Sequence, residues 1–289
     1  MKNILILASN GQVGSEFREL HSNYKEYNWF FTDKKELDIT NKILVEQYIK
    51  DNSINIIINC AAYTKVDLAQ KVQDKANVVN NIAVKHLSEI VKTHNIKFIH
   101  ISTDSVFDGK NYKPYNEDDK TSPLNIYSQT KLAGENEMIK INPSNSIIIR
   151  TSWVYSSYGN NFVKTMLRLG RERDELGVVF DQVGTPTYAR DLVKTILKIS
   201  PKIKNKKVEI YNYSNEGVLS WYDFAKEIMK LANLNCKINP IETYQYPTPA
   251  ARPHYSVLNK SKIKKEFNIE ISYWKDSLIK CLKILEEGK

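Results

Sequence analysis

Several features that define whole classes of protein are missing from this sequence of 289 residues. Its three cysteines, Cys60, Cys236 and Cys281, are odd in number and far apart, which excludes a disulfide framework and the usual spacings of zinc ligands. No stretch approaches the ~20 apolar residues that a membrane-spanning helix needs. The start of the chain also lacks the pattern of a signal peptide. We therefore expect a soluble, cytoplasmic protein with no membrane partner.

Positive charge is in clear excess, with 42 Lys and Arg against 33 Asp and Glu and a formal net charge of +9. No basic run is interleaved with aromatic side chains that stack on bases, so the charge alone is weak support for nucleic-acid binding. A positive field also favours the capture of a substrate that carries phosphate groups. We expect such a small molecule as the partner, and no nucleic acid.

Short apolar runs alternate with longer segments of helical periodicity over the first 150 residues. The run at 54–59 is nearly continuous in apolar side chains, as in a strand buried on both faces. Strands that alternate with helices predict a parallel sheet covered on both sides, which is a doubly wound, Rossmann-type α/β fold. The predicted strands are 3–7, 28–32, 54–59, 97–101 and 146–150, and the predicted helices lie near 12–20, 42–50, 74–94 and 122–140.

A glycine-containing turn follows the first predicted strand. Such a turn lets backbone N–H groups and a helix N-terminus approach a pyrophosphate. Gly11 and Gly14 occupy two of the expected glycine positions, and Ala8 occupies the first, which requires a negative φ at that residue. Asp33, 19 residues beyond Gly14, is placed to accept hydrogen bonds from an adenosine ribose, while Lys34 suits a 2′-phosphate. The sequence therefore predicts NADPH or NADH as cofactor without choosing between them.

Small residues follow the third predicted strand, in the segment 59–64. At the carboxyl end of a strand they allow a ligand to lie close to the backbone. Beyond residue 150 the pattern is less regular and prolines are frequent, with further helices predicted at 221–232 and 274–286. We predict a dinucleotide-binding domain over residues 1–150 and a smaller, mainly substrate-binding lobe over 151–289 that is partly interleaved with the core.

Tyr127 and Lys131 are four residues apart on a predicted helix, so both side chains lie on one face. Ketone reduction needs a hydride on carbon and a proton on oxygen, and a free tyrosine, with a pKa near ~10, exchanges protons slowly at neutral pH. A nearby ammonium favours the phenolate and lowers that pKa. Thr103, at the end of the fourth predicted strand, adds a hydroxyl for the same carbonyl, and His100 is expected to pack in the core.

These motifs resemble those of the extended short-chain dehydrogenases/reductases, and within them the dTDP-4-dehydrorhamnose reductase family. The resemblance covers nearly the whole chain. It rests most specifically on the segments 181–187 and 246–253, and also on 10–14, 61–67, 102–104, 127–135, 150–155 and 159–163.

The resemblance implies reduction of the C4 keto group of dTDP-4-dehydro-L-rhamnose, with Thr103, Tyr127 and Lys131 as the catalytic trio. Tyr127 would donate the proton. Lys131 would adjust the pKa of Tyr127 and hold the nicotinamide ribose. Cofactor contacts are expected from Asn10, Gly11, Gln12, Val13, Asp33, Lys34, Asp38, Ile39, Ala61, Ala62 and Tyr63 as well as from Tyr127 and Lys131. Substrate contacts are expected from Val66, Thr103, Asp104, Trp153, Asn161 and Arg252.

The sequence departs from the family pattern at several positions. Ala8 replaces a glycine, Ser105 replaces a tyrosine that would contact the sugar, and Gln70 replaces an acidic residue. Some family members form a dimer bridged by magnesium through glutamates. Glu16 matches one of those positions, but Arg190 occupies another, so we predict no metal site and either a monomer or a homodimer.

Two other functions remain open at this stage. Because of Ser105, the protein could instead be a related reductase that acts on another 4-keto-6-deoxysugar nucleotide. A non-catalytic NADP-binding regulatory subunit, similar to that of methionine adenosyltransferase, is disfavoured by the intact Thr103, Tyr127 and Lys131.

Overall fold

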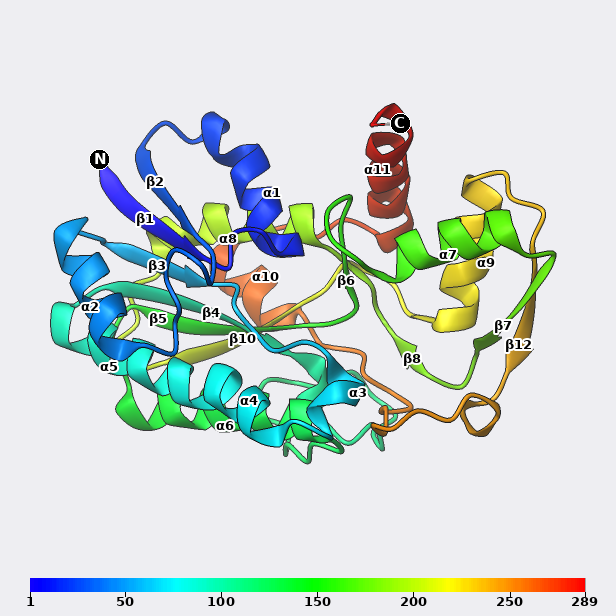
Figure 1. Cartoon of the computed structure of the whole chain (residues 1–289), viewed down its shortest axis with the longest axis horizontal. Helices are drawn as coiled ribbons and strands as arrows, with labels where there is room; N and C mark the ends of the chain where they lie inside the picture. The colour runs from blue at the N-terminus through cyan, green and yellow to red at the C-terminus, as the bar shows by residue number, and fades with distance from the viewer. Residues whose placement is uncertain (289) are drawn as a thin grey trace.

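The computed structural model describes residues 1–288, and its centre is a six-stranded sheet in the order β10-β5-β4-β3-β1-β2. Every neighbouring pair of strands in this sheet is parallel (Figure 1). The predicted doubly wound α/β fold is therefore confirmed. The strands are β1 (Lys2–Leu7), β2 (Tyr27–Thr32), β3 (Ile56–Asn59), β4 (Lys97–Thr103), β5 (Ser146–Thr151) and β10 (Glu209–Tyr213).

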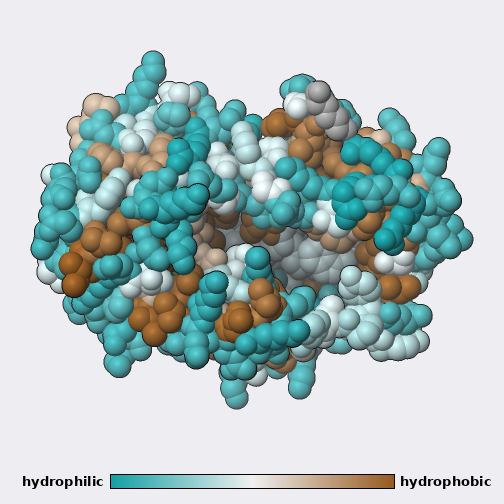
Figure 2. Space-filling view, in the orientation of Figure 1, coloured by the Kyte–Doolittle hydropathy of each residue, from teal (hydrophilic) through white to brown (hydrophobic). Residues whose placement is uncertain are grey.

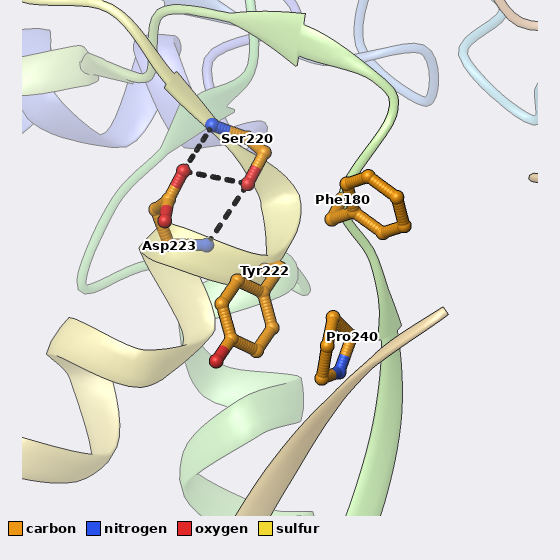
Figure 3. A pocket seen from close by; sticks show the side chains of 5 residues that line it. All are labelled: Phe180, Ser220, Tyr222, Asp223 and Pro240. Atoms are coloured by element: carbon orange, nitrogen blue, oxygen red, sulfur yellow. Dashed lines mark hydrogen bonds between the residues drawn. The ribbon is translucent and has the colours of Figure 1, made fainter. Parts of the chain in front are cut away.

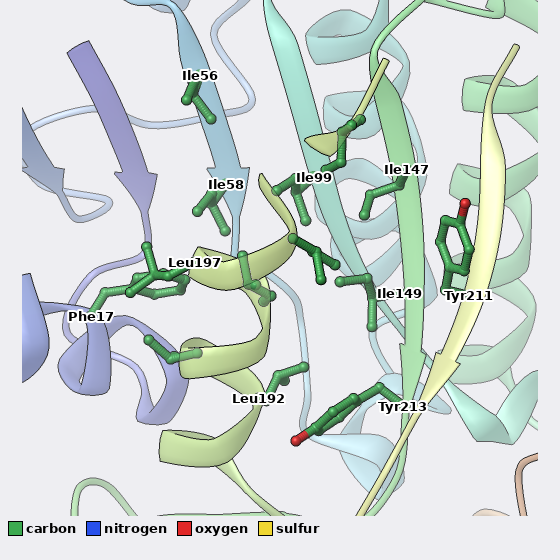
Figure 4. Packing of buried hydrophobic residues seen from close by; sticks show 14 of the residues in the cluster. Phe17, Ile56, Ile58, Ile99, Ile147, Ile149, Leu192, Leu197, Tyr211 and Tyr213 are labelled. Carbon is green, nitrogen blue, oxygen red and sulfur yellow. The ribbon is translucent and has the colours of Figure 1, made fainter. Parts of the chain in front are cut away.

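Helices cover both faces of the sheet, because the strands present apolar side chains on both sides. On one face, isoleucines such as Ile58 and Ile149 pack against Phe17 and Leu192 (Figure 4). Burying each such side chain contributes roughly 1.5–3 kcal/mol to folding. This face carries α1 (Gln12–Leu20), α8 (Ala189–Ile199) and α10 (Ser261–Phe267), and the other carries α2 (Lys42–Asp51), α5 (Ala83–His94) and α6 (Ile126–Ile141).

A second lobe lies beside the sheet, on the right of Figure 1, and has its own apolar core. Its parallel pair of strands is β7 (Glu175–Val179) with β12 (Lys237–Ile241). Around this pair lie α7 (Phe162–Glu172), α9 (Trp221–Leu231) and α11 (Trp274–Glu287). Shorter strand pairs connect the two parts: β6 (Val154–Tyr155) with β9 (Thr187–Tyr188), and β8 (Val183–Gly184) with β11 (Leu219–Ser220).

Several element boundaries differ from the prediction. Helix α6 begins at Ile126 rather than at residue 122, because the Asn125 side chain accepts the N–H of Ser128 and caps the helix there. The helix predicted over 74–94 is divided into α4 (Gln73–Asn77), a π-helical segment (Val78–Ile82) and α5, and it is preceded by a short helix α3 (Val66–Ala69). None of the helices within residues 1–288 is long and apolar enough to cross a membrane.

Candidate active site

A cleft of about 470 Å³ lies at the carboxyl ends of β1, β3 and β4. Strands β1 and β3 are neighbours although β2 lies between them in sequence, so the strand order reverses here, as at the ligand sites of open α/β sheets. In the orientation of Figure 1, the molecular surface has a hollow near its middle (Figure 2). Nine residues predicted as site residues line the cleft, namely Gly11, Gln12, Val13, Ala62, Thr103, Asp104, Tyr127, Lys131 and Trp153.

The turn after β1 forms one wall of the cleft. A Cβ atom at Gly14 would lie 2.5 Å from the carbonyl oxygen of Ala8, so only glycine fits there. Ala8 itself has a φ of +56°, whereas the sequence argument required a negative φ, and that expectation is wrong. The left-handed conformation costs a non-glycine residue roughly 1–2 kcal/mol. Gly11 begins α1 without any side-chain cap, which leaves the first N–H groups of the helix for a ligand.

The residues predicted to contact the adenosine end of the cofactor lie beyond the cleft lining, after β2. The amide of Asn10 donates to the Asp33 carboxylate at 2.7 Å, which brings the ends of β1 and β2 together. Lys34 is exposed and lies 3.5 Å from Asp38. Ile39 is 7% exposed and belongs to the apolar core between the sheet and α2, so its side chain is not open to a ligand.

The segment after β3 is held in place by backbone hydrogen bonds. The N–H of Ala61 donates to Asn59 Oδ1 at 3.0 Å. The N–H and carbonyl of Tyr63 both bond to the amide of Asn80, in the π-helical segment. Of the predicted residues in this segment, only Ala62 lines the cleft.

Tyr127 and Lys131 project from α6 into the cleft beside Thr103 at the end of β4, as predicted. Burial raises the pKa of Tyr127 to about 12; a hydrogen bond with Thr103 lowers that pKa, and the charge of Asp104 raises it. Burial lowers the pKa of Lys131 to about 8, against the opposing effect of Glu135. Without a ligand, therefore, the phenol stays protonated at neutral pH.

Asp104 and Trp153 line the part of the cleft next to the second lobe. Burial raises the pKa of Asp104 to about 6, although hydrogen bonds from Ser256 and Thr103 act against this increase. Trp153 has a φ of +47°, and its ring stacks on Trp221 with centroids 3.6 Å apart. A left-handed conformation is unusual for so large a residue, and such strain concentrates at functional sites.

The three remaining predicted substrate residues do not line the cleft. Val66 begins α3. Asn161 caps α7 and donates to Gln12 Oε1 at 3.0 Å, so it connects the second lobe to the glycine-containing turn. The guanidinium of Arg252 forms an ion pair with Asp67 at 2.9 Å, and its charge is thereby partly neutralised.

About half of the cleft lining was not named residue by residue from the sequence, although Ala8 and Gly14 belong to the predicted cofactor turn and Cys60 and Thr64 to the segment 59–64. Gly159 and Asn160 belong to a motif that had been noted, and the residues around the ends of β4 and β5 follow from the position of the cleft at the strand ends. The lining residues that were not named individually as cofactor or substrate contacts are Ala8, Gly14, Cys60, Thr64, Ile101, Ser102, Thr151, Val154, Gly159 and Asn160.

The positions that depart from the family pattern have clear structural partners. The Ser105 hydroxyl bonds to that of Ser128, in the first turn of α6. Gln70 Oε1 accepts the N–H of Ile126 at 2.9 Å, so this residue caps the helix that carries Tyr127.

Glu16 and Arg190, the two positions compared with a magnesium site, form an ion pair at 2.7 Å in which Glu16 is fully buried and Arg190 is partly exposed. Ser156 donates to the other carboxylate oxygen of Glu16 at 2.6 Å. Within residues 1–288 there is no cluster of three or more His, Cys, Asp or Glu side chains suited to a metal ion.

A second pocket, of about 400 Å³, lies in the second lobe between β7, β12 and the start of α9 (Figure 3). Phe180, Tyr222 and Pro240 supply its apolar surface. Its polar side chains, Ser220 and Asp223, bond to one another in a capping box and satisfy the first turn of α9. These two side chains therefore stabilise the start of α9.

The parallel sheet, the glycine-containing turn at its switch point and the Tyr–Lys pair define a Rossmann-fold reductase of the short-chain type. The chain belongs to the RmlD substrate binding domain family, whose model matches residues 1–287. The predicted family membership is thus confirmed.

Individual relatives agree with this assignment. The chain is 42% identical to a dTDP-4-dehydrorhamnose reductase of Aggregatibacter actinomycetemcomitans, with 96% of this chain and 97% of the relative covered. The crystal structure of a dTDP-4-dehydrorhamnose reductase from Clostridium acetobutylicum superposes with a TM-score of 0.93 at 39% identity, covering 98% and 99% of the two chains. A Bacillus anthracis dTDP-4-dehydrorhamnose reductase in complex with NADP gives the same TM-score and identity, with coverage of 98% and 100%.

Proposed function

We propose that this protein is an NAD(P)H-dependent oxidoreductase that reduces the C4 keto group of dTDP-4-dehydro-L-rhamnose to give dTDP-L-rhamnose. One observation carries the proposal: a single cleft is lined by the glycine-containing turn and by Thr103, Tyr127 and Lys131. The enzymatic names of relatives that align with nearly the whole chain support the choice of substrate.

The residues around β1 suit a nicotinamide dinucleotide. The uncapped start of α1 offers backbone N–H groups and the positive end of the helix dipole to a pyrophosphate. Asp33 would accept from the ribose, and Lys34 would pair with a 2′-phosphate, so both NADH and NADPH are accommodated. When bound, the cofactor supplies the hydride. Asn10, Gly11, Gln12, Val13, Asp38, Ile39, Ala61, Ala62 and Tyr63 would complete this region, with Ile39 contributing through its backbone.

Tyr127 would deliver the proton that the reduced oxygen requires. Its high pKa in the ligand-free cleft keeps the hydroxyl protonated and ready to donate. Thr103 is placed to bond to the same sugar oxygen and to polarise the carbonyl. Positive charge near the phenol would then stabilise the phenolate that is left after transfer. Lys131 would provide that charge and also hold the nicotinamide ribose.

The remaining predicted residues would bind the nucleotide sugar. Asp104 and Trp153 line the cleft next to the reacting groups, and Asn161 would position the second lobe over Gln12. Val66 would contact the sugar, and Arg252 would act once its ion pair with Asp67 opens. In this arrangement residues 1–150 mainly bind the dinucleotide, and residues 151–289 mainly bind the substrate and are partly interleaved with the core. We further propose a cytoplasmic enzyme that works as a monomer or homodimer.

Measurement of cofactor oxidation with and without the keto-sugar nucleotide separates this proposal from the alternatives. The proposal predicts NAD(P)H oxidation only when dTDP-4-dehydro-L-rhamnose is present. Binding of cofactor without any turnover would favour a regulatory subunit. Turnover only with a different 4-keto-6-deoxysugar nucleotide would favour a related reductase. That alternative remains because Ser105, which bonds to Ser128 on α6, replaces the tyrosine of the family pattern.

A further inference from the structure

Residues 250–252, which follow β12 in the chain, are bound to α3 and to the start of α6 (Figure 1). The carboxylate of Asp67, on α3, accepts the N–H of Ala250 at 3.1 Å. The amide of Asn125, which caps α6, donates to the carbonyl oxygen of Ala251 at 2.8 Å. Ala250 is fully buried and Asn125 is 2% exposed, so the backbone of this segment is held firmly in place.

The ion pair between Asp67 and Arg252 lies at the rim of the cleft. Thr64, three residues before Asp67, belongs to the cleft lining. The Ser256 side chain, four residues after Arg252, bonds to Asp104, which is another residue of the lining. Both members of the ion pair are therefore close in the chain to groups that line the cleft or contact its lining.

The side chain of Arg252 can change partners without any movement of this backbone. Its Nη2 donates to Asp67 Oδ2 at 2.9 Å, and its Nη1 donates to the carbonyl oxygen of Ala250 at 2.7 Å. The N–H of Ala250 bonds to the other carboxylate oxygen, Oδ1. The side chains of Arg252 and Asp67 are 28% and 44% exposed, so water and dissolved anions reach both. Because exposed ion pairs are weak, a competing anion can replace the carboxylate.

The substrate of the proposed reaction carries a diphosphate, for which the cleft lining offers little positive charge. Among residues 1–288, Lys131 is the only lysine, arginine or histidine in that lining. It is 1% exposed and is assigned to the nicotinamide ribose. Asp104, in the same lining, repels phosphate when it is ionised. A guanidinium binds phosphate in the same forked geometry as carboxylate, so Arg252 is suited to the diphosphate.

We propose that Asp67 competes with the diphosphate of the nucleotide sugar for Arg252, and thereby sets the affinity of the enzyme for substrate and product. The inference rests on the proposed function. In the free enzyme the carboxylate of Asp67 holds the guanidinium, and a phosphate takes its place when the nucleotide sugar binds. When the product leaves, the carboxylate binds the guanidinium again, so Asp67 speeds release. Asp67 is a positioning residue, because it acts through Arg252 and does not contact the reacting atoms.

Replacement of Asp67 by asparagine removes the competing charge and keeps the bond to Ala250. The amide oxygen can accept the same N–H, whereas the NH₂ group cannot accept from the guanidinium. Asp67→Asn should therefore bind dTDP about two- to fivefold more tightly than the wild type, as expected for loss of an exposed ion pair. The affinity for thymidine, which has no phosphate, should stay the same. Both are measured by NMR titration. Unchanged or weaker dTDP binding, or equal tightening of both ligands, would overturn the inference.

A double-mutant cycle tests whether the effect passes through Arg252. Arg252→Gln should weaken dTDP binding at least about tenfold, because hydrogen bonds between charged groups are lost. In that background Asp67→Asn should leave dTDP affinity unchanged. Tightening that persists there would mean that Asp67 acts only through its negative field, which contradicts the inference. Glu172→Gln removes the same charge from the exposed pair with Arg168 and, as the control, should leave dTDP affinity unchanged.

Steady-state kinetics separate competition for Arg252 from a purely structural role of Asp67. In Asp67→Asn, KM for dTDP-4-dehydro-L-rhamnose should fall and kcat should not rise, because the product is released more slowly. A higher KM would show that the substitution merely loosens residues 250–252, and would overturn the inference. If dTDP binding tightens but this substrate is not turned over, the proposed function fails and the competition for Arg252 stands. Normal turnover with unchanged dTDP affinity would have the opposite meaning.

Discussion

At the scale of single residues, the chemistry depends on the environment of Tyr127. Burial and the charge of Asp104 raise its pKa to about 12, with the Thr103 hydrogen bond acting against them. A donor with so high a pKa keeps its proton until a carbonyl oxygen begins to gain charge. The phenolate that follows is costly in this buried position, and neighbouring positive charge is therefore essential.

Replacement of this phenol is the sharpest change at one residue. Tyr127→Phe keeps the ring but removes the proton, so kcat should fall at least ~100-fold, as for loss of a general acid. Cofactor affinity, measured by fluorescence titration, should change little. Tyr222→Phe, in the second pocket, is the matched control and should retain wild-type turnover. A Tyr127→Phe enzyme with normal kcat would remove Tyr127 from the mechanism.

The conformation of Ala8 predicts a gain in stability. Glycine adopts the φ of +56° without the 1–2 kcal/mol cost of a side chain, but it loses more backbone entropy on folding. Ala8→Gly should therefore raise the free energy of unfolding by about 0.5–1 kcal/mol, as measured by urea denaturation. Ala62→Gly, at a cleft position that lacks a positive φ, should lower it. Equal losses in the two variants would show that Ala8 is not strained.

At the scale of secondary-structure elements, a buried ion pair joins β5 to the helix of the catalytic pair. Arg150 donates three hydrogen bonds to the carboxylate of Glu135 on α6, and their side chains are 3% and 0% exposed. Arg150→Leu leaves the carboxylate buried and unpaired, which should lower the free energy of unfolding by about 3–5 kcal/mol. Arg168→Leu breaks the exposed pair with Glu172 and should cost under about 1 kcal/mol. Similar losses in thermal unfolding of both variants would contradict this assignment.

The elements also show how far sequence reasoning extends. The first five strands were predictable because each is a compact, largely apolar run; β3 and β5 are buried throughout, whereas β2 lies at the edge of the sheet and is partly exposed. Strand β10 was missed since its sequence, Glu209–Tyr213, contains polar residues and becomes a strand only through its pairing with β5. Helices α7 and α8 were also missed, although Asn161 caps the first. The π-helical segment contains Asn80, whose side chain bonds to the backbone of Tyr63, a tertiary contact that local periodicity does not show.

The candidate site was predictable where one motif lies on one element. Tyr127 and Lys131 face the same cleft because of their spacing on α6. By contrast, Arg252 bonds to Asp67 across 185 residues, and only the folded chain reveals that contact. His100 was rightly predicted to be buried on its strand, but its polar partners come from two other elements.

At the scale of the whole molecule, burial of ionisable groups in the cleft lowers the free energy of unfolding at neutral pH. The raised pKa of Asp104, about 6, means that its stabilising contribution is complete below pH ~4 and is lost as the pH rises through 6. Asp104→Asn avoids this loss. Its free energy of unfolding at pH 7.5 should be about 3 kcal/mol higher than that of the wild type, since two pKa units correspond to roughly that amount. The difference should vanish near pH 4. The exposed Asp118→Asn serves as the control and should show little difference from wild type at either pH.

Following the hydride from cofactor to sugar is the most direct test of the proposed reaction. The enzyme would be given dTDP-4-dehydro-L-rhamnose and NADPH carrying two deuterium atoms at nicotinamide C4, so that transfer from either face is detected, and the product would be analysed by NMR. We expect dTDP-L-rhamnose with one deuterium, bonded to C4 of the sugar, and a matching loss of NADPH. Oxidation of the cofactor without deuterium at that carbon, a product of the other configuration at C4, or no reaction with this substrate would contradict the proposed reaction.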